Sequence, residues 1–280
     1  MPISKENIAA SFSKVAANYE NDAFLQQEVA NRLLERLELM TSNPATILDA
    51  GCGTGYCTRA LKGRFPKAKL FGVDLAEGMI EQAKKTQKLF KHNDYQVGDI
   101  EELPFKSNTF DLVFSNLAIL WMDNPEIALQ ELNRVLTPKG LIIFSTMGPD
   151  TLIELRQSWQ QIDKNIHVNH FIDMHLIGDA VHKSGFENTV IDRDVITLTY
   201  KTMKGLMGEL KSVGAHNMNQ DRSKGLLGRG RFKKLEDAYE EFRRDDGGLP
   251  VTCEVVYGHA WKKGEGSVGV KDYHTYDVEL

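Results

Sequence analysis

The segment 48–55 has the sequence Leu-Asp-Ala-Gly-Cys-Gly-Thr-Gly and is the strongest indication of the fold. A short apolar run, Ile47-Leu48, leads into it and predicts a buried strand that ends in a glycine loop, and a helical pattern follows over 56–64. Glycine allows positive φ and lets the backbone approach a ligand closely. Because open α/β sheets bind ligands at the carboxyl ends of their strands, the loop is predicted to be a ligand site.

The glycine spacing separates the classes of loop that bind nucleotides. The dinucleotide pattern G-x-G-x-x-G, counted from Gly51, would need a third glycine where the chain has Tyr56. The phosphate-binding P-loop needs Gly-Lys followed by Ser or Thr, which this segment lacks. What remains is Asp49 followed by G-x-G-x-G, which resembles motif I of class I S-adenosylmethionine (SAM) methyltransferases. The alternative is a glycine turn that binds no ligand.

Strand and helix patterns alternate outward from this loop. Strands are predicted at 47–50, 70–74, 95–97, 110–115, 141–146, 187–200 and 251–261. Helices are predicted at 22–40, 56–64, 76–90, 125–136, 151–163, 174–184, 201–213 and 231–244, and a turn at 137–140. This alternation predicts an α/β fold, a Rossmann-like and mainly parallel sheet with helices on both faces. Inserted helices between residues 150 and 250 are expected to form a lid on one sheet edge.

Further acidic residues follow the next strands. A carboxylate at Asp74 can accept hydrogen bonds from both ribose hydroxyls, and a simple helix N-cap is the alternative. Asp99 and Ile100 resemble the adenine site of SAM enzymes, where the carboxylate takes the exocyclic amine; a plain turn residue is the alternative. The end of strand 110–115 should face the methionine part of SAM. The resemblance implies cofactor contacts from Asp49, Gly51, Gly53, Gly55, Asp74, Leu75, Met79, Asp99, Ile100, Asn116 and Leu117.

Segments outside the glycine loop narrow the family. They are 11–20, 115–121, 148–156, 196–200, 214–217 and 255–261. Together they resemble the malonyl-[acyl-carrier protein] O-methyltransferases of biotin synthesis over residues 5–262. The resemblance implies methyl transfer from SAM to the free carboxylate of malonyl-acyl-carrier protein, giving the methyl ester that primes pimeloyl synthesis. It also implies a lid and helix at 1–45, a SAM-binding core at 46–148, and a substrate and carrier-protein region with the remaining strands at 149–262. The resemblance ends there, and the polar, glycine-punctuated residues 263–280 are expected to form a disordered tail.

Three side chains are predicted to act on the substrate. A carboxylate with an unperturbed pKa near ~4 is already ionised at pH 7, so it needs no general base. Catalysis can then rest on positioning and desolvation. Tyr19 is expected to cover the sulfonium from an N-terminal lid, and Arg156 to clamp the carboxylate with its guanidinium. His216 is a weaker candidate. Core packing of Tyr19, a solvated Arg156 and a structural His216 are the alternatives.

The charge distribution points to an acidic partner. With 34 Lys and Arg against 39 Asp and Glu, the net charge is −5, which argues against a globally basic nucleic-acid binder. The segment 222–234 nevertheless contains only basic charges: Arg222, Lys224, Arg229, Arg231, Lys233 and Lys234. We expect it to form part of a dock for the acidic carrier protein by electrostatic steering, with a solvated basic face as the alternative. No nucleic-acid or membrane partner is expected, and a monomer is favoured.

The number of cysteines and the length of the apolar runs indicate in which cellular compartment the protein is expected. Three cysteines form an odd, sparse set, which predicts no disulfide framework and a reducing environment. Cys52 and Cys57, near the glycine loop, are interpreted as inert small residues, and no metal-ligand spacing is present. No signal-like or membrane-spanning apolar run is found, so a cytoplasmic location is expected.

Three other functions stay open at this point. The first is a methyltransferase of another small acid. The second is an assembly factor with a SAM-type fold, resembling a protein-arginine hydroxylase. The third is a SAM-binding module without catalysis.

Overall fold

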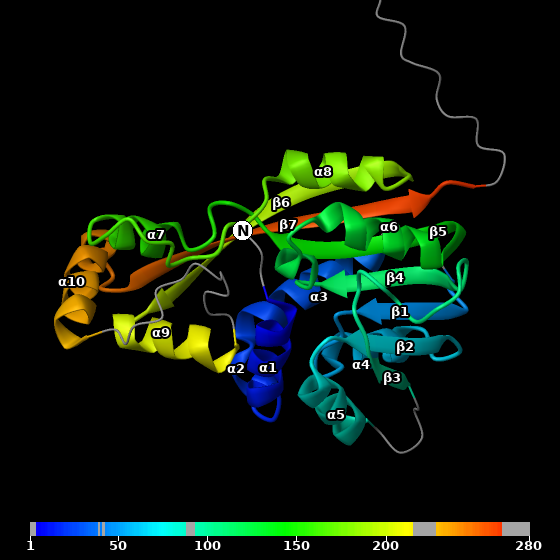
Figure 1. Ribbon diagram of the computed structural model, residues 1–280, viewed down its shortest axis with the longest axis horizontal. Helices are drawn as coiled ribbons and strands as arrows, with labels where there is room; N and C mark the ends of the chain where they lie inside the picture. The colour runs from blue at the N-terminus through cyan, green and yellow to red at the C-terminus, as the bar shows by residue number, and fades with distance from the viewer. Residues whose placement is uncertain (1–3, 39, 41–42, 88–92, 215–227, 265–280) are drawn as a thin grey trace, which may run out of the picture.

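One mixed sheet organises the molecule (Figure 1). The computed structural model describes residues 4–38, 40, 43–87, 93–214 and 228–264, and seven strands within them pair in the order β3-β2-β1-β4-β5-β7-β6. Strands β1 to β5 are parallel, whereas β7 pairs antiparallel with both β5 and β6. Their bounds are β1 (Thr46–Ala50), β2 (Lys69–Asp74), β3 (Asp94–Val97), β4 (Phe110–Asn116), β5 (Leu136–Met147), β6 (Phe186–Tyr200) and β7 (Leu249–Lys262).

Helices cover both faces of the sheet, which confirms the predicted α/β class. They are α1 (Lys5–Val15), α2 (Tyr19–Asp22), α3 (Phe24–Glu38), α4 (Tyr56–Arg64), α5 (Glu77–Thr86), α6 (Pro125–Val135), α7 (Ile153–Gln160), α8 (Met174–Lys183), α9 (Met203–Ser212) and α10 (Arg229–Tyr239), with short turns η1 (Ile119–Trp121) and η2 (Glu240–Phe242). Side chains alternate along the buried strands, so Ile47 packs with α3 and α4 while Leu48 packs with α6. None of the described helices is long and apolar enough to span a bilayer.

The N-terminus forms a helix, α1, where the sequence pattern predicted helical structure only from residue 22. The side chain of Ser4 caps it by accepting a hydrogen bond from the Asn7 amide. The helix packs closely on α5: the Ser13 hydroxyl accepts from the Gly78 amide at 3.1 Å, and a Cβ on Gly78 would lie 2.7 Å from the Ser13 carbonyl oxygen. Contact between these two helices brings α1 to the carboxyl ends of the parallel strands, where the glycine loop lies.

Strands β6 and β7 extend beyond the ends of the parallel strands of the sheet. The last residue of β5, Met147, is level with Val255 of β7. Beyond that pair, β6 and β7 continue alone as a two-stranded ribbon to the pair of Tyr200 and Leu249. The six β7 residues from 249 to 254 extend the ribbon by about 20 Å at ~3.4 Å per residue. Helices α7, α9 and α10 gather along this ribbon, which is where most of the inserted helices lie (Figure 1).

Several predicted boundaries differ from the structure. The turn expected at 137–140 belongs to β5, because Leu136 already pairs with Phe110 before a shift in register. Helix α7 covers only 153–160 because Leu152, with φ of 58°, precedes it in the left-handed region. Helix α5 is described only to Thr86, short of the predicted 90, and residues 265–280 of the predicted tail lie outside the described residues.

Candidate active site

The glycine loop is fixed to the neighbouring strand and open on its other side. The Gly51 amide donates to the Val73 carbonyl at 2.8 Å, which holds the loop against the end of β2. A Cβ on Gly51 would lie 2.2 Å from the Cβ of Ala118, so only glycine fits there. At Gly53, where φ is 53°, an added Cβ would meet nothing within 4 Å. The backbone of the loop therefore faces open space where a ligand can approach it.

Asp74 is held in one orientation beside this loop. One carboxylate oxygen accepts from the Gly53 amide at 2.8 Å and the other from the Ala76 amide at 2.8 Å. Burial raises the pKa of this carboxyl, while the two amide hydrogen bonds oppose that change. Because each oxygen has more than one lone pair, the carboxylate can still accept hydrogen bonds from two neighbouring hydroxyls.

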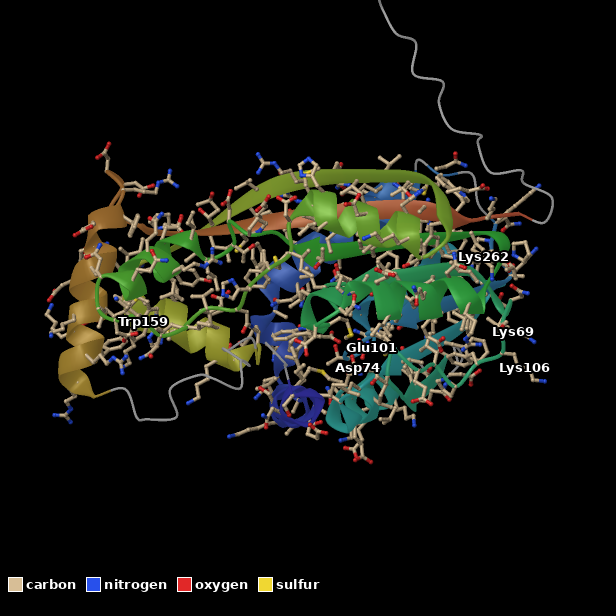
Figure 2. The ribbon with its side chains drawn as sticks, turned by 45° about the horizontal axis from the view of Figure 1, so that its top comes forward. Lys69, Asp74, Glu101, Lys106, Trp159 and Lys262 are labelled. Carbon is tan, nitrogen blue, oxygen red and sulfur yellow. The ribbon has the colours of Figure 1, made fainter. Side chains whose placement is uncertain are left out.

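Asp99 lies at the end of β3 and connects the site to α1. One of its carboxylate oxygens accepts from the Glu101 amide at 2.9 Å, and the other accepts from the Lys5 ammonium at 2.6 Å. Lys5 also pairs with the Glu101 carboxylate. The side chain of Lys5, the first residue of α1, thus binds the carboxylates at the edge of the site. Figure 2 shows Glu101 close to Asp74 in that view.

A single cavity of about 1170 Å³ joins these groups. Nine of the predicted cofactor residues line it, namely Gly51, Gly53, Asp74, Leu75, Met79, Asp99, Ile100, Asn116 and Leu117. A carboxylate beside a bare backbone loop, followed by a second carboxylate and apolar side chains, fits the ribose and adenine of SAM. The residues that line this end of the cavity therefore suit this cofactor.

Asp49 and Gly55 support the loop from behind and do not line the cavity. The buried Asp49 carboxylate accepts from the Thr58 hydroxyl at 2.6 Å. Burial raises the pKa of Asp49 to about 7. Gly55 has φ of 81°, and a Cβ there would lie 2.5 Å from the Tyr95 hydroxyl oxygen. Direct contact of Asp49 and Gly55 with a cofactor stays a prediction; their observed contacts are with the protein.

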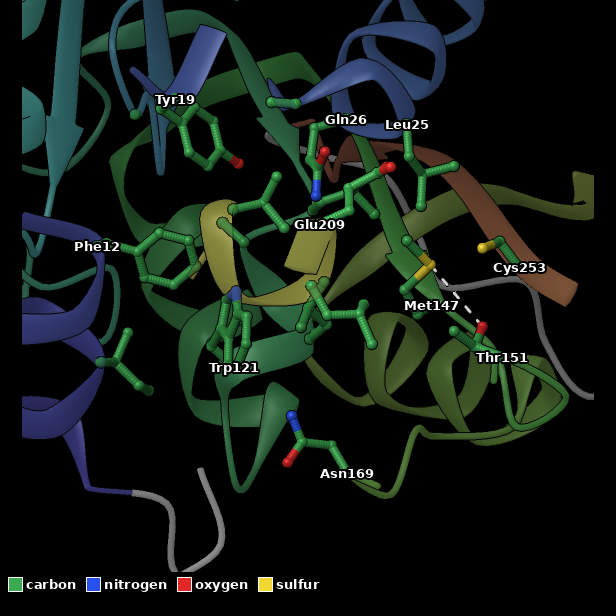
Figure 3. Close-up of a pocket in the computed structure, with 18 of the residues that line it drawn as sticks. Phe12, Tyr19, Leu25, Gln26, Trp121, Met147, Thr151, Asn169, Glu209 and Cys253 are labelled. Atoms are coloured by element: carbon green, nitrogen blue, oxygen red, sulfur yellow. Dashed lines mark hydrogen bonds between the residues drawn. The ribbon is translucent and has the colours of Figure 1, made fainter. Parts of the chain in front are cut away.

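An aromatic wall closes the cavity on the side of the N-terminal helices (Figure 3). The ring of Phe12 meets Tyr19 edge-on at 6.2 Å and Trp121 at 5.4 Å between centroids. Burial raises the pKa of the Tyr19 phenol, so this group stays protonated at neutral pH. The Tyr19 hydroxyl and the Gln26 amide both point into the cavity. Gln26 was missed by sequence reasoning, because nothing in its pattern separates it from other polar helix residues.

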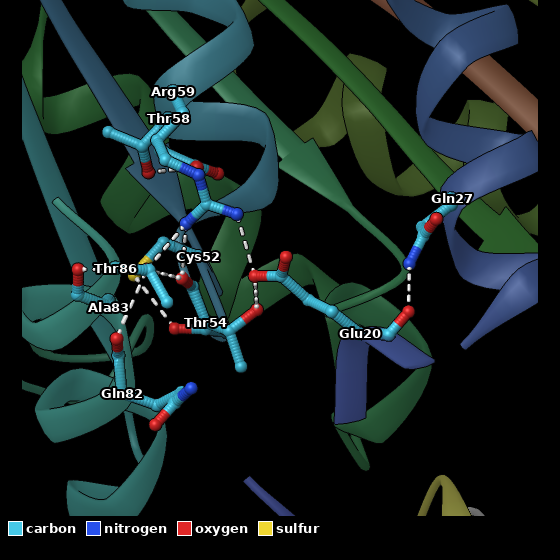
Figure 4. A network of polar contacts seen from close by, with 11 residues as sticks. Glu20, Gln27, Cys52, Thr54, Thr58, Arg59, Gln82, Ala83 and Thr86 are labelled. Atoms are coloured by element: carbon cyan, nitrogen blue, oxygen red, sulfur yellow. Dashed lines mark hydrogen bonds and ion pairs between the residues drawn. The ribbon is translucent and has the colours of Figure 1, made fainter. Parts of the chain in front are cut away.

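A polar network ties α2 to the glycine loop (Figure 4). The Glu20 carboxylate accepts from the Thr54 hydroxyl at 2.6 Å and from the Arg59 guanidinium at 2.6 Å. Arg59 also donates to the Thr54 carbonyl at 2.8 Å, and the Gln27 amide donates to the Glu20 carbonyl at 2.5 Å. The helix that carries Tyr19 is therefore fastened to the loop, through residues far apart in sequence that no local motif marks.

The Arg156 side chain is bound within its own turn. The Arg156 guanidinium donates to the carbonyl oxygens of Pro149 at 2.8 Å and Thr151 at 3.1 Å, and this side chain does not line the cavity. These bonds hold the turn between β5 and α7. Its predicted action as a carboxylate clamp stays a prediction, and His216 lies outside the described residues.

The cavity continues from the glycine loop onto the ribbon. Its far walls come from α7, α9, α10 and the two ribbon strands, and include Leu155, Leu198, Leu206, Phe232 and Val251. Among the residues that the structure describes, no group of three or more His, Cys, Asp or Glu side chains could hold a metal ion.

This sheet order, with a glycine loop after β1 and an acidic residue ending β2 on one cavity, defines a class I methyltransferase. A family model described as a methyltransferase domain matches residues 48–144. A curated relative from Laribacter hongkongensis is 45% identical over 92% of this chain and 89% of its own. One from Legionella pneumophila is 40% identical over 91% of this chain and 90% of its own. Both are named malonyl-[acyl-carrier protein] O-methyltransferase, and the chain belongs to this family.

Solved structures share the fold. The YcgJ protein of Bacillus subtilis has a TM-score of 0.58 at 16% identity, covering 82% of this chain and 97% of that one. A phosphoethanolamine N-methyltransferase of Haemonchus contortus, solved with S-adenosyl-L-methionine, has a TM-score of 0.51 at 20% identity, covering 84% of this chain and 52% of that one. At these identities the likeness concerns the fold alone.

Proposed function

We propose that this enzyme uses SAM to methylate the free carboxylate of malonyl-acyl-carrier protein. The observation that carries the proposal is the continuous cavity, which joins a cofactor end to an apolar chamber over the ribbon. The family relatives at 40–45% identity bear the same activity in their names. A chamber of this depth suits an acyl group presented on a long arm better than a small free acid.

The cofactor end has groups for each part of SAM. The Asp74 carboxylate would accept hydrogen bonds from the ribose hydroxyls, the Asp99 carboxylate would accept one from the exocyclic amine, and Ile100 would pack on the adenine ring. Gly51 and Gly53 let the backbone lie against the methionine part. SAM, when bound, supplies an electrophilic methyl group on a sulfonium.

The acceptor end needs donors rather than a base. The malonyl carboxylate is ionised at neutral pH, because an unperturbed carboxyl pKa is near ~4. The protonated Tyr19 hydroxyl and the Gln26 amide point into the cavity, where they donate hydrogen bonds that orient this carboxylate. The ring of Phe12 and the indole of Trp121 exclude water there, which strips the carboxylate of hydration and makes it more nucleophilic.

The carrier protein docks on α10 in this proposal. Arg229 and Lys234 are exposed on α10, whereas Arg231 pairs with Asp163 and Lys233 with Asp237. Arg222 and Lys224 lie outside the described residues. Replacing Arg229 and Lys234 together with Gln should raise KM for the carrier-linked substrate, most at low salt, because steering is screened by salt. Unchanged kinetics at every ionic strength would remove the dock.

A label-transfer assay tests the activity itself. The full chain is incubated with methyl-labelled SAM and, in separate reactions, malonyl-acyl-carrier protein, malonyl-coenzyme A and malonate. We expect fastest labelling of the carrier-linked substrate. A preference for the free acid would favour a small-acid methyltransferase. Absence of transfer to all three while SAM binds would refute methylation of malonyl thioesters and leave a SAM-binding module or a different reaction.

A further inference from the structure

A second polar cluster lies at the end of the cavity farthest from the glycine loop. Trp159, His167 and Arg231 line the cavity, and Asp163 joins the last two. The Asp163 carboxylate accepts from His167 Nε2 at 2.9 Å and pairs with the Arg231 guanidinium. Figure 2 shows Trp159 toward one end of the molecule and Asp74 near its middle. The predicted cofactor site does not use this cluster.

The cluster is assembled to hold two nitrogen donors in fixed positions. The His167 ring stacks on Trp159 with centroids 3.7 Å apart and planes at 13°, and the Arg231 guanidinium carbon lies 5.5 Å from the same indole. Burial by itself raises the pKa of Asp163, but hydrogen bonds from Arg231 and His167 outweigh it and lower this pKa to about 2. The carboxylate therefore stays ionised at any physiological pH and orients both partners.

Among the residues that the structure describes, Asp163 is the one hydrogen-bond acceptor given for the Arg231 guanidinium, which leaves most of its donor capacity for a ligand. A guanidinium carries five N–H donors in a planar fork, and the ion pair with Asp163 involves one of its terminal nitrogens. Planar forks of this kind match the oxygens of phosphate groups. Because Arg231 lines the cavity, its other N–H groups can face an anion that enters there.

The cavity extends along β7 past the last residue of β5, which indicates an elongated ligand. Met147 lines the cavity at the level of Val255, and Val251 lines it four residues further along β7. Four residues of extended strand correspond to about 14 Å. Leu155, Leu198 and Leu206 make much of the wall of this passage apolar, and Glu209 of α9 also lines the cavity. A ligand that fits is a slender, largely uncharged chain that carries a reactive group at one end and an anion at the other.

We propose that Arg231, held by Asp163 beside the stacked rings of His167 and Trp159, binds the phosphate at the base of the arm that presents the malonyl group. This inference rests on the proposed function. Carrier proteins attach acyl groups through a phosphopantetheine arm, whose uncharged amide chain ends in a single phosphodiester. The thioester then lies near Tyr19 and Met147, the pantetheine chain in the apolar passage, and the phosphodiester at the cluster. The carrier itself lies outside, beside the exposed Arg229 and Lys234 of α10.

Two truncated substrates that differ only in the phosphate test the subsite. The wild-type enzyme is assayed with malonyl-pantetheine and malonyl-phosphopantetheine, neither of which includes the carrier. We expect kcat/KM to be about tenfold or more higher for the phosphorylated substrate, as is typical of charge-assisted hydrogen bonds. Arg231→Gln should bring this ratio close to one, and Arg231→Lys, which keeps the charge but loses the fork, should give an intermediate ratio.

Lys164 provides the matched control. It neighbours Asp163 in sequence, is exposed and does not line the cavity, so Lys164→Gln removes one positive charge beside the cluster without touching the passage. We expect this variant to keep the wild-type ratio. SAM affinity and melting temperature of each variant show that the fold and the cofactor end are intact, which matters because Arg231→Gln also breaks the pair with Asp163.

The outcomes separate this inference from the activity on which it rests. Methylation of both truncated substrates with equal kcat/KM overturns the phosphate subsite and leaves the proposed function standing. A ratio that Arg231→Gln leaves unchanged, or that Lys164→Gln lowers as much as Arg231→Gln does, overturns it as well, and so does methylation confined to the carrier-linked substrate. No methylation of any malonyl thioester overturns both proposals.

Discussion

Replacing Gly55 with alanine measures how tightly the glycine loop packs. Gly55 has φ of 81°, a conformation that costs an L-residue about 1–2 kcal/mol. The new Cβ would lie 2.5 Å from the Tyr95 hydroxyl oxygen and 3.3 Å from the Cβ of Ala83. Tyr95 is packed in a buried cluster and cannot move away freely, and such overpacking costs about 1–3 kcal/mol. The sum, about 2–5 kcal/mol, is a large part of the ~5–15 kcal/mol that stabilises a typical domain.

Gly53 is the control for this change. Its φ of 53° is also left-handed, but an added Cβ would meet nothing within 4 Å. Gly53→Ala should therefore lower the free energy of unfolding by only about 1–2 kcal/mol. Because Gly53 lines the cavity and Gly55 does not, the added methyl group should instead weaken SAM binding.

Urea unfolding and calorimetric titration with SAM distinguish the two variants. Unfolding midpoints with unchanged m-values give the loss of stability, and titration of the folded protein gives the affinity. We expect Gly55→Ala to have the lower midpoint and Gly53→Ala the weaker affinity. If Gly55→Ala unfolds at the wild-type midpoint, the loop is not packed against Tyr95 as described and the reasoning fails.

Three further predictions concern single polar groups. Asp74→Asn should weaken SAM binding by about tenfold or more, since it removes a charged acceptor of hydrogen bonds worth about 1.5–3 kcal/mol; titration checks this. Burial raises the pKa of Asp49 from 3.8 to about 7, so its contribution to stability is fully present below pH 3.8 and is lost as the pH rises through 7. Unfolding free energies across this range should fall with pH less steeply in Asp49→Asn than in wild type, and parallel curves would contradict that pKa. Arg156→Ala should lower the unfolding free energy by about 1–3 kcal/mol through the lost carbonyl bonds and leave SAM affinity unchanged; a stable variant with a raised substrate KM would instead support the predicted action of Arg156 as a clamp.

Sequence patterns located the cofactor end because its determinants are local. Gly51, Asp74 and Asp99 each follow directly on a strand pattern, and parallel strands bring their carboxyl ends to one sheet edge. Helix α1 was missed although Ile8 and Phe12 have helical spacing after the cap at Ser4. A closer count of that spacing would have found it.

The rest of the site depends on contacts between distant segments. Arg156 was predicted to meet substrate because its residue type suits a carboxylate; that action stays a prediction, and the contacts that the structure gives for its guanidinium are with two backbone carbonyls of its own turn. The stack of His167 on Trp159, and the salt bridge that brings Arg231 to it, join three separate parts of the chain. The alternation of apolar and polar residues predicted strands at 187–200 and 251–261. Nothing in either pattern says how far these two strands pair with each other beyond the end of β5.

The ribbon of β6 and β7 has a consequence for how this family can diverge. Because side chains alternate faces, an insertion of two residues in each strand keeps the same face toward the cavity, whereas an insertion of one reverses it. Each such paired insertion would move α10 outward by about 7 Å and leave every parallel strand in place. Paired insertions near Tyr200 and Leu249 can thus change the distance between α10 and the cofactor end in discrete steps. The residues of the cofactor end need not change with them.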